Sequence, residues 1–355
     1  EFKEELQKLL DKNKDKWRKN AIGETQKYID GLVERATTRE LDWGVEVPVK
    51  GYENKRIYVW IEAVLGYLST ADKVLHERGQ NPDEVLSDNN QNLRVYMVHG
   101  KDNIPFHTTI FPALELAIGN NYRLPDYIIS SAYVNLNNEK MSKSKGNLIS
   151  VNELLELFNK DTLRFYFIFN GPEVKDISCS IEEMITVHNK FLVGTLGNFI
   201  NRNFSFINKK FEGIITEGKV DSKIKETTLN TYKEVGELIE KGELKSALSK
   251  VMDYISLGNK YYDENTPWIK VKENITEFND ITYTCTYMIV NIANLIKPFL
   301  SETSEKILNM LNISKESNWQ EKELTGNIKI VNNELLFNRI DDEETKSIMD
   351  KLNNK

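Results

Sequence analysis

Three lysines lie on one short segment, NNEKMSKSKGN, at residues 137–147. Lysine is a flexible point charge that suits phosphate better than planar groups. The serines and the glycine between the lysines allow the segment to change shape. A loop of this kind at a strand end of a nucleotide-type sheet predicts contact with a triphosphate, where lysines stabilise the charge on leaving pyrophosphate. A solvated surface loop is the alternative interpretation.

The rest of the chain is not basic. It has 355 residues, 40% of them hydrophobic and 28% charged, and a formal net charge of −7. The first two values are ordinary for globular proteins, and the length predicts two domains or a little more. A polyanion would therefore have to meet a local patch. No apolar run long enough to cross a membrane and no signal peptide is visible, which predicts a cytoplasmic protein without a membrane partner.

The first part of the sequence alternates strands with helices, which predicts an α/β fold with a parallel sheet. Residues 1–36 have apolar side chains at helical spacing. Strands are expected at Ile57–Ile61, at Leu93–Val98 and within residues 125–134. Ligands of such sheets bind at the carboxyl ends of the strands, where Gly100 and the lysine segment follow.

The later part of the sequence is helical. Ser150 and Glu153 have the spacing of a capping box, and Asp161 could cap the next helix. Long periodic segments from about residue 181 to residue 311 predict an all-α helical bundle. The polar tail holds two short strand-like runs, IKIV and LLFNRI.

The string KMSKS resembles the signature loop of class I aminoacyl-tRNA synthetases. Further segments resemble methionyl-tRNA synthetase over nearly the whole chain: RELDWGVEVP, YVWIEAVLGYLS, GKDNIPFHTTIFPALELA, GNFINRNFSFINKKFEG, NKYYDENTPW and LLFNRIDDEE. KMSKS alone would indicate only the class, whereas the combination indicates the family. The resemblance implies a ligase that activates methionine with ATP and Mg²⁺ and transfers the methionyl group to tRNA(Met).

The resemblance also implies an ATP site. Gly100 and Asp102 match residues that meet the ribose, and the backbone of Val134 matches a position that meets adenine. The catalytic loop comprises Lys140, Met141, Ser142, Lys143 and Ser144, of which Lys143 matches the lysine that reaches the phosphates. A turn glycine and a helix-capping aspartate are the plain alternatives for the ribose pair.

A methionine pocket is implied on two segments, by Val59, Trp60, Ala63, Tyr67, Asn103, His107 and Phe111. A thioether favours apolar and aromatic walls with weak polar contacts, which these residue types supply. His107 and Phe111 are four apart and are expected on one helix face. Val64 stands where many relatives have proline, and Phe111 where many have tryptophan, which leaves the exact shape of the pocket open but keeps its apolar character.

Readers of the CAU anticodon are implied at Asn198, Arg202, Pro267 and Trp268. Asn198 and Arg202 are four apart and fall roughly opposite the apolar stripe of Ile185, Leu192, Leu196, Ile200 and Ile207. An amide and a guanidinium can read base edges, and an exposed tryptophan can stack on an unstacked base. An ordinary polar surface with a half-buried tryptophan is the alternative.

The second signature of class I synthetases, HIGH, is nowhere in the sequence, and all four histidines lie in other contexts. We therefore expect the C-terminal part of such an enzyme, without its HIGH-bearing half and without a zinc site. The expected regions are a helical remnant of an insertion (1–36), half of a Rossmann-type domain with the KMSKS loop (37–150), connecting helices (151–180), the anticodon-binding bundle (181–311) and a tail (312–355). A non-catalytic tRNA-binding module, either a truncated paralogue or one part of a split synthetase, and a structural fragment are the alternatives.

Overall fold

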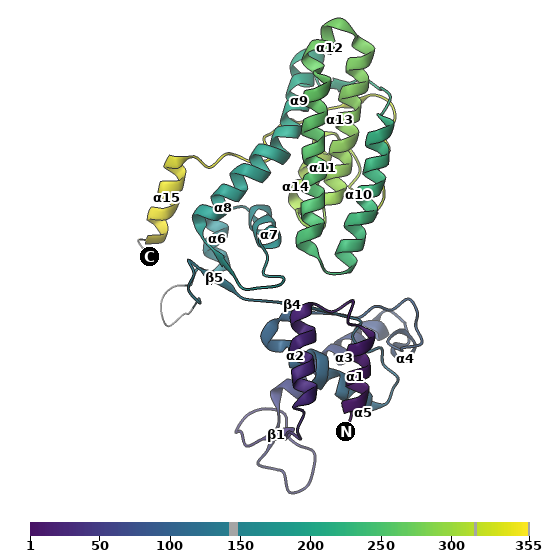
Figure 1. Cartoon of the computed structure of the whole chain (residues 1–355), viewed down its shortest axis with the longest axis vertical. Helices are drawn as coiled ribbons and strands as arrows, with labels where there is room; N and C mark the ends of the chain where they lie inside the picture. The colour runs from purple at the N-terminus through teal and green to yellow at the C-terminus, as the bar shows by residue number, and fades with distance from the viewer. Residues whose placement is uncertain (142–147, 316–317, 354–355) are drawn as a thin grey trace. The chain divides into compact units, whose positions relative to one another are not determined.

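The computed structural model describes residues 1–141, 148–315 and 318–353, and it consists of two compact units (Figure 1). Unit 1 comprises Glu1–Tyr133 together with Pro172–Asp176. Unit 2 comprises Val134–Gly171 together with Ile177–Lys355. Each unit has its own hydrophobic core, so each is described by itself.

Unit 1 is an α/β unit built on short strands. Its helices are α1 (Lys3–Lys12), α2 (Lys19–Asp30), α3 (Val59–Glu77), α4 (Pro82–Val85) and α5 (Phe111–Ile118). Its strands are β1 (Thr38–Arg39), β2 (Arg56–Ile57), β3 (Tyr96–Gly100) and β4 (Tyr127–Ser131). Strands β3 and β4 pair in parallel, as the sequence predicted, whereas β1 and β2 pair antiparallel.

The core of unit 1 joins the two N-terminal helices to the β3–β4 region. Helices α1 and α2 pack side by side and bury apolar residues that recur at helical spacing (Figure 1). The buried cluster comprises Leu6, Leu9, Leu10, Trp17, Ala21, Ile29, Ile104 and Ile128. This core holds β4 and the segment after β3 in place, and that segment carries several of the predicted site residues.

Two of the predicted strands are placed differently in the structure. The prediction of a strand at Ile57–Ile61 is wrong beyond Ile57, because α3 begins at Val59. A short apolar run cannot be told from the start of a buried helix by periodicity alone. The strand expected at Leu93–Val98 is shifted and occupies Tyr96–Gly100.

The segment after β3 changes helix type twice. A 3₁₀ turn, Lys101–Asn103, leads through Pro105 into a π-helical segment, Phe106–Ile110, and then into α5. Helix α5 ends at Ile118, and the next residue, Gly119, has a φ of 80°, the left-handed conformation that favours glycine at a helix end. π-helical turns are frequent at functional sites, and this one carries His107.

Unit 2 is mostly helical. Its helices are α6 (Val151–Leu157), α7 (Lys160–Phe169), α8 (Ile181–Val187), α9 (Asn198–Phe211), α10 (Ser222–Glu240), α11 (Leu244–Asn265), α12 (Pro267–Glu273), α13 (Ile275–Ile296), α14 (Ser301–Met310) and α15 (Asp342–Asn353). A π-helical segment, His188–Gly197, joins α8 to α9. The strands are β5 (Val134–Leu136), β6 (Ile177–Cys179), β7 (Ile214–Ile215) and β8 (Ile328–Lys329); β5–β6 is parallel and β7–β8 antiparallel.

The predicted helical bundle is confirmed. Helices α10, α11 and α13 pack against one another along their lengths, with α13 buried over most of its surface (Figure 1). The expected apolar stripe, Ile185, Leu192, Leu196, Ile200 and Ile207, is buried throughout. The stripe runs through the π-helical segment, so its path departs from a strict 3.6-residue period.

Helix starts in unit 2 confirm one capping prediction and correct another. Ser150 and Glu153 form a complete capping box at the start of α6. The cap of α7 is Asn159, and the expectation for Asp161 was wrong. Asp161 lies inside the first turn of α7, where its buried carboxylate accepts hydrogen bonds from the backbone N–H and the hydroxyl of Thr303 on α14.

The tail of unit 2 contains one of the two expected strands. IKIV supplies β8, but LLFNRI is irregular chain that buries Leu336, Phe337 and Ile340. Asn189 holds this stretch, because its side chain donates to the carbonyl of Ile340 and accepts from the N–H of the same residue. Helix α15 follows and packs against α8, and the sequence did not predict it.

Candidate functional sites

An aromatic cluster forms in unit 1 between α3 and the segment after β3. The Tyr67 hydroxyl and His107 Nε2 are 3.0 Å apart. The ring of Phe111 meets the Tyr67 ring edge-on, with centroids 5.8 Å apart. Trp60 stacks on Phe106 at 4.2 Å between centroids. The structure therefore brings together, around Tyr67, the predicted methionine-pocket residues of two separate segments.

The remaining predicted pocket residues lie at the edge of this cluster. Val59, Ala63 and Tyr67 are spaced by four on α3 and form one stripe of that helix. Val59 and Tyr67 are 42% and 47% exposed, so this face of α3 is open within the described chain. Asn103 contributes its backbone carbonyl, which lies 2.9 Å from His107 Nδ1. Phe111 is fully buried and forms the floor.

The hydrogen bonds of His107 define its tautomer. A carbonyl oxygen can only accept, so Nδ1 carries the proton that is donated to Asn103. Nε2 of the neutral ring is then an acceptor, and the Tyr67 hydroxyl donates to it. Burial lowers the pKa of His107, so the ring is uncharged at neutral pH. The polar edge of the cluster is therefore neutral.

Two residues of this cluster were not singled out from the sequence. His99, at the penultimate position of β3, stacks on His107 with ring centroids 4.3 Å apart. Burial is the main cause that lowers the pKa of His99 to about 4, and the charge that His107 can carry lowers it further. Phe106 is the partner of Trp60. The sequence offered one indication for Phe106, which directly precedes His107 in the GKDNIPFHTT segment. No neighbouring residue indicated that His99 would join the cluster.

The predicted ATP-site residues lie in both units. Gly100 ends β3, and Asp102 follows in the 3₁₀ turn, where its carboxylate accepts a hydrogen bond from the Tyr133 hydroxyl. Val134 begins β5 in unit 2. Lys140 is exposed and Met141 is partly buried just after β5, and these are the KMSKS residues that the structure describes. Ser142, Lys143 and Ser144 lie outside the described residues.

A second cluster forms in unit 2 on α9, α11 and α12. The side chain of Arg202 forms an ion pair with Asp263, and its guanidinium lies over the Tyr262 ring, 4.7 Å from the centroid. The Tyr262 and Trp268 rings are 5.8 Å apart. Asn198 donates to the side-chain oxygen of Asn259 at 3.0 Å. The structure therefore gathers the predicted anticodon readers.

The chain path around Trp268 explains its exposure. Helix α11 ends at Asn265, Thr266 adopts a left-handed conformation with a φ of 44°, and Pro267 starts α12. Proline suits the first helical position, so a new helix can begin at once in a new direction. Pro267 is buried, and Trp268 is 40% exposed at the start of α12.

The α11 partners in this cluster were missed by sequence reasoning. Asn259, Tyr262 and Asp263 lie 61, 60 and 61 residues from their partners on α9, so no local pattern connects them. Hydrogen bonding by Asp263 is the main cause that raises the pKa of Arg202, and the same bond lowers the pKa of Asp263. Both side chains stay partly exposed, at 29% and 56%, so the pair holds Arg202 in place without strong stabilisation.

Comparison with known proteins identifies the family. The model for class I tRNA synthetases (M) matches residues 1–204, and the model for the anticodon binding domain of methionyl tRNA ligase matches residues 215–355. The chain belongs to the methionyl-tRNA synthetase family. The family that the sequence resembled is thereby confirmed, together with its anticodon-binding domain.

Curated relatives agree along nearly the whole chain. Methionine–tRNA ligase 1 of Alkaliphilus oremlandii is 42% identical over 341 residues, which are 96% of this chain and 62% of that protein. Methionine–tRNA ligase of Bacillus cereus strain G9842 is 39% identical over 354 residues, 99% of this chain and 64% of that protein. The chain thus spans somewhat less than two thirds of the length of these relatives.

Solved structures show the same fold. The Mycobacterium tuberculosis methionyl-tRNA synthetase in complex with methionyl-adenylate superposes with a TM-score of 0.82, at 23% identity over 95% of this chain and 67% of that one. Its apo form superposes with a TM-score of 0.80 at 21% identity. The expected combination of a Rossmann-type catalytic domain with a helical anticodon domain is therefore confirmed at the level of the fold.

Two further observations concern the described residues alone. Within residues 1–141, 148–315 and 318–353, no helix is long and apolar enough to span a membrane. Within the same ranges, no three histidine, cysteine, aspartate or glutamate side chains gather in a way that could hold a metal ion. Both cysteines, Cys179 and Cys285, are buried and free.

Proposed function

We propose that this polypeptide acts in methionine–tRNA ligation, in which ATP with Mg²⁺ activates methionine and the methionyl group passes to tRNA(Met) in the cytoplasm. The observation that carries the proposal is the aromatic cluster with one neutral polar edge, Tyr67 hydrogen-bonded to His107. A methionine side chain is apolar, flexible and weakly polar at sulfur, and such a cluster matches it. Membership of the family supports the same conclusion.

The side chain of methionine would lie against the rings of Trp60, Tyr67 and Phe111. The tautomer of His107 makes the Tyr67 hydroxyl donate inward to Nε2, so the oxygen of Tyr67 presents a lone pair to the ligand. A charged amino-acid side chain would lose its hydration there without gaining a counter-charge. This cost would keep charged amino acids out of the cluster. The cluster therefore favours an uncharged side chain of methionine size.

Activation would begin when a carboxylate oxygen of methionine attacks the α-phosphorus of ATP. The new O–P bond gives methionyl-adenylate, and the bond to the leaving pyrophosphate breaks. Gly100 and Asp102 of unit 1 would meet the ribose, and the backbone of Val134 in unit 2 is the predicted contact for adenine. Lys140 and Lys143 of the KMSKS loop, with Met141, Ser142 and Ser144 around them, would offset the charge of the phosphates.

Anticodon recognition would take place on unit 2. Trp268, which is 40% exposed, offers an aromatic face for an unstacked base. Arg202 and Asn198 offer donors to base edges, and Pro267 directs Trp268 outward at the start of α12. Asp263 and Asn259 hold the two readers on α9 in fixed orientations, which reduces the entropy lost on binding.

The sequence without HIGH favours a second candidate, a tRNA-binding module that does not activate methionine. HIGH histidines help to hold the ATP phosphates in class I synthetases, and this sequence contains no such motif. We therefore propose that the 355-residue chain by itself binds its ligands without forming methionyl-adenylate. In that case the ligase activity belongs to a polypeptide that supplies this motif as well.

Equilibrium dialysis of the purified chain against each radiolabelled amino acid tests the proposal. We expect methionine to bind in preference to every other natural amino acid, and ATP–pyrophosphate exchange by the chain alone to stay at background. Loss of methionine binding in Phe111→Ala, with unit 1 still folded as judged by hydrogen exchange of peptides within residues 86–130, supports the pocket. Equal binding of leucine, isoleucine and methionine would contradict it. Methionine-dependent ATP–pyrophosphate exchange by the chain alone would contradict the proposal that a chain without HIGH does not form methionyl-adenylate.

A further inference from the structure

A separate cavity lies in unit 1 behind Tyr67 and Phe111. It has a volume of about 160 Å³ and is enclosed by α3, α5 and the chain that leads into β3. Its lining is almost wholly apolar, with Leu68, Ala71, Leu93, Val95 and Met97 among the walls. Apolar cavities of about 150 Å³ stay dry and bind molecules of the size of benzene. The cavity therefore has the size and the chemistry of a small-ligand site.

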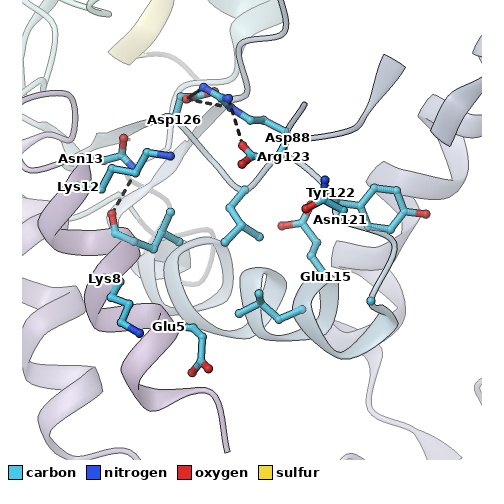
Figure 2. Close-up of a pocket in the computed structure, with 14 residues that line it drawn as sticks. Glu5, Lys8, Lys12, Asn13, Asp88, Glu115, Asn121, Tyr122, Arg123 and Asp126 are labelled. Carbon is cyan, nitrogen blue, oxygen red and sulfur yellow. Dashed lines mark hydrogen bonds and ion pairs between the residues drawn. The ribbon is translucent and has the colours of Figure 1, made fainter. Parts of the chain in front are cut away.

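Two charged residues, Glu115 and Arg123, interrupt this apolar lining. Glu115 on α5 is only 3% exposed, and its Oε2 atom has no hydrogen-bond partner among the described residues. Figure 2 shows a neighbouring polar pocket, which Glu115 also lines together with Asn121 and Tyr122. A buried polar atom without a partner costs free energy that a ligand can recover by supplying one. Glu115 is thus an unsatisfied group at the wall of an otherwise apolar cavity.

The other charged group at this wall is already satisfied. The guanidinium of Arg123 is 2.7 Å from Asp126 and 3.1 Å from Asp88 (Figure 2). Its charge is therefore matched outside the cavity. Burial raises the pKa of Glu115 to about 8, so its carboxyl group is protonated at neutral pH and can both donate and accept a hydrogen bond. A charged ligand has no counter-charge to meet in the cavity.

The aromatic walls favour an aromatic ligand. Phe111 and Tyr67 already meet edge-on, and both line the cavity. A third ring can add edge-to-face contacts to them, which an aliphatic molecule of the same volume cannot do. Tyr67 is 47% exposed, so this wall of the cavity is a ring that also reaches the surface.

We propose that this cavity is a binding site for a small neutral aromatic molecule with one hydroxyl group, of the size of phenol. The ring lies between α3 and α5, against Leu68, Ala71 and Met97. The hydroxyl group exchanges hydrogen bonds with the carboxyl group of Glu115. The site is distinct from the proposed methionine pocket, from which the rings of Tyr67 and Phe111 separate it.

A matched pair of probes tests the site on the 355-residue chain. Fluorobenzene and 4-fluorophenol differ by the hydroxyl group alone, and fluorine NMR titration measures the affinity of each. We expect both to bind, with 4-fluorophenol about tenfold tighter, the ratio that one hydrogen bond to a buried partner typically provides. Failure of both probes to bind would overturn the proposal, whatever the outcome of the methionine-binding experiment.

Three substitutions locate the binding. Glu115→Leu is expected to bring the two affinities within about twofold, whereas Glu115→Gln keeps the preference for the hydroxyl because an amide can still exchange hydrogen bonds. Ala71→Leu fills the cavity and is expected to weaken both probes at least tenfold. Ala117→Leu, on the exposed part of α5 away from the cavity, is the control and leaves both unchanged. An undiminished preference for the phenol in Glu115→Leu, or equal binding by Ala71→Leu and Ala117→Leu, would overturn the assignment.

Discussion

The two candidate sites hold their polar groups in opposite ways. Unit 1 keeps titratable groups uncharged by burying them: His107 in the aromatic cluster and Glu115 beside the apolar cavity are 4% and 3% exposed, and His99 stacks on His107. The cluster in unit 2 keeps its groups charged and leaves them partly in water, with Arg202 paired to Asp263. Burial without a counter-charge disfavours the charged form of a group, whereas an opposite charge favours it.

The difference follows the chemistry of the proposed ligands. A thioether has no charge to offer, so a charged side chain in the methionine pocket would remain unpaired after water leaves. Bases offer hydrogen-bonding edges and aromatic faces while keeping much of their hydration, so an exposed guanidinium and an exposed indole can meet them. The site in unit 1 thus avoids the cost of desolvating a charge by using uncharged groups, and the site in unit 2 avoids it by pairing its charge. The experiments below test each of these separately.

The largest expected effect is on the stability of unit 1 in alkaline solution. Folding raises the pKa of Glu115 from the ordinary 4.5 to about 8 through burial. The folded state then holds a proton that the unfolded state releases, so stability falls as pH rises from about 4.5 to about 8. At about 1.4 kcal/mol per pKa unit, the loss is at most roughly 5 kcal/mol.

Glu115→Gln removes this titration while keeping the shape of the side chain. We expect the variant to match the parent at pH 4 and to be more stable by several kcal/mol at pH 9. Hydrogen exchange of peptides within residues 86–130, read by mass spectrometry, reports the stability of unit 1 directly. Asp263→Asn in unit 2 is the control and leaves the exchange of these peptides unchanged. An identical pH dependence in Glu115→Gln and the parent would show that Glu115 is ionised in the folded protein.

Acid should have the next largest effect on unit 1. Burial lowers the pKa of His99 from 6.5 to about 4, and it lowers the pKa of His107 as well. The unfolded state then binds protons that the folded state does not, so stability falls as pH drops from about 6.5 towards 4. The His99 contribution is at most roughly 3.5 kcal/mol at about 1.4 kcal/mol per pKa unit.

Histidine NMR can follow both rings, because the chain has four histidines. We expect His107 to show the Nδ1-protonated tautomer at neutral pH, and His99 to stay neutral to about pH 4. His107→Phe keeps a stacked ring without a charge, so the pKa of His99 should rise in this variant. Exposed His76 and the unit 2 residue His188 serve as reference signals and should not respond. Protonation of His99 and His107 together at their ordinary pKa would contradict the neutral cluster.

Anticodon binding should respond to changes in unit 2 alone. Stacking on Trp268 is expected to contribute about 1 to 3 kcal/mol, and base contacts by Arg202 a similar amount. Trp268→Ala and Arg202→Ala should therefore weaken binding of a CAU stem-loop by roughly 5- to 150-fold in a fluorescence titration. Because the net charge is −7, binding should be modest and should weaken as salt increases.

A stem-loop with a scrambled anticodon is the control for sequence reading, and His107→Phe is the control for unit 1. Asp263→Asn tests the role of the ion pair: Arg202 keeps its charge but loses the opposite charge that holds it in place, so discrimination between the two loops should fall more than affinity does. Equal affinity for both loops in the parent protein, or no loss in either reader variant, would show that this cluster does not read the anticodon.

Local patterns predicted the elements that local chemistry decides. The capping box at Ser150 and Glu153 and the buried stripe of α8 and α9 depend on residues a few positions apart, and both are found in the structure. The aromatic content around Tyr67 and His107 was also visible in the sequence. The resemblance to a family, rather than any pattern in the residues, suggested the roles of these side chains.

Long-range pairings were not predictable. The orientation of Arg202 depends on Asp263, 61 residues away, and the neutrality of His107 depends on burial that tertiary packing creates. The strand expected at Ile57–Ile61 failed because β-branched and aromatic residues suit both a strand and the start of a buried helix. Glu115, in an apolar helix, had no feature in the sequence that marked it as buried and unpaired.

The smallest expected effect concerns the choice between methionine and norleucine in unit 1. Norleucine replaces sulfur with a methylene group and is nearly isosteric, and apolar pockets separate such neighbours by only about 1 to 3 kcal/mol. We expect norleucine to compete with methionine in equilibrium dialysis within about a factor of ten.

Tyr67→Phe removes the oxygen that faces the ligand and should bring the affinities for methionine and norleucine together, with little loss for norleucine. Thr195→Val in unit 2 removes a hydroxyl far from this pocket in the sequence and should change neither affinity. Complete rejection of norleucine by the parent protein, or an unchanged ratio in Tyr67→Phe, would show that a stronger polar contact than the Tyr67–His107 edge selects the side chain.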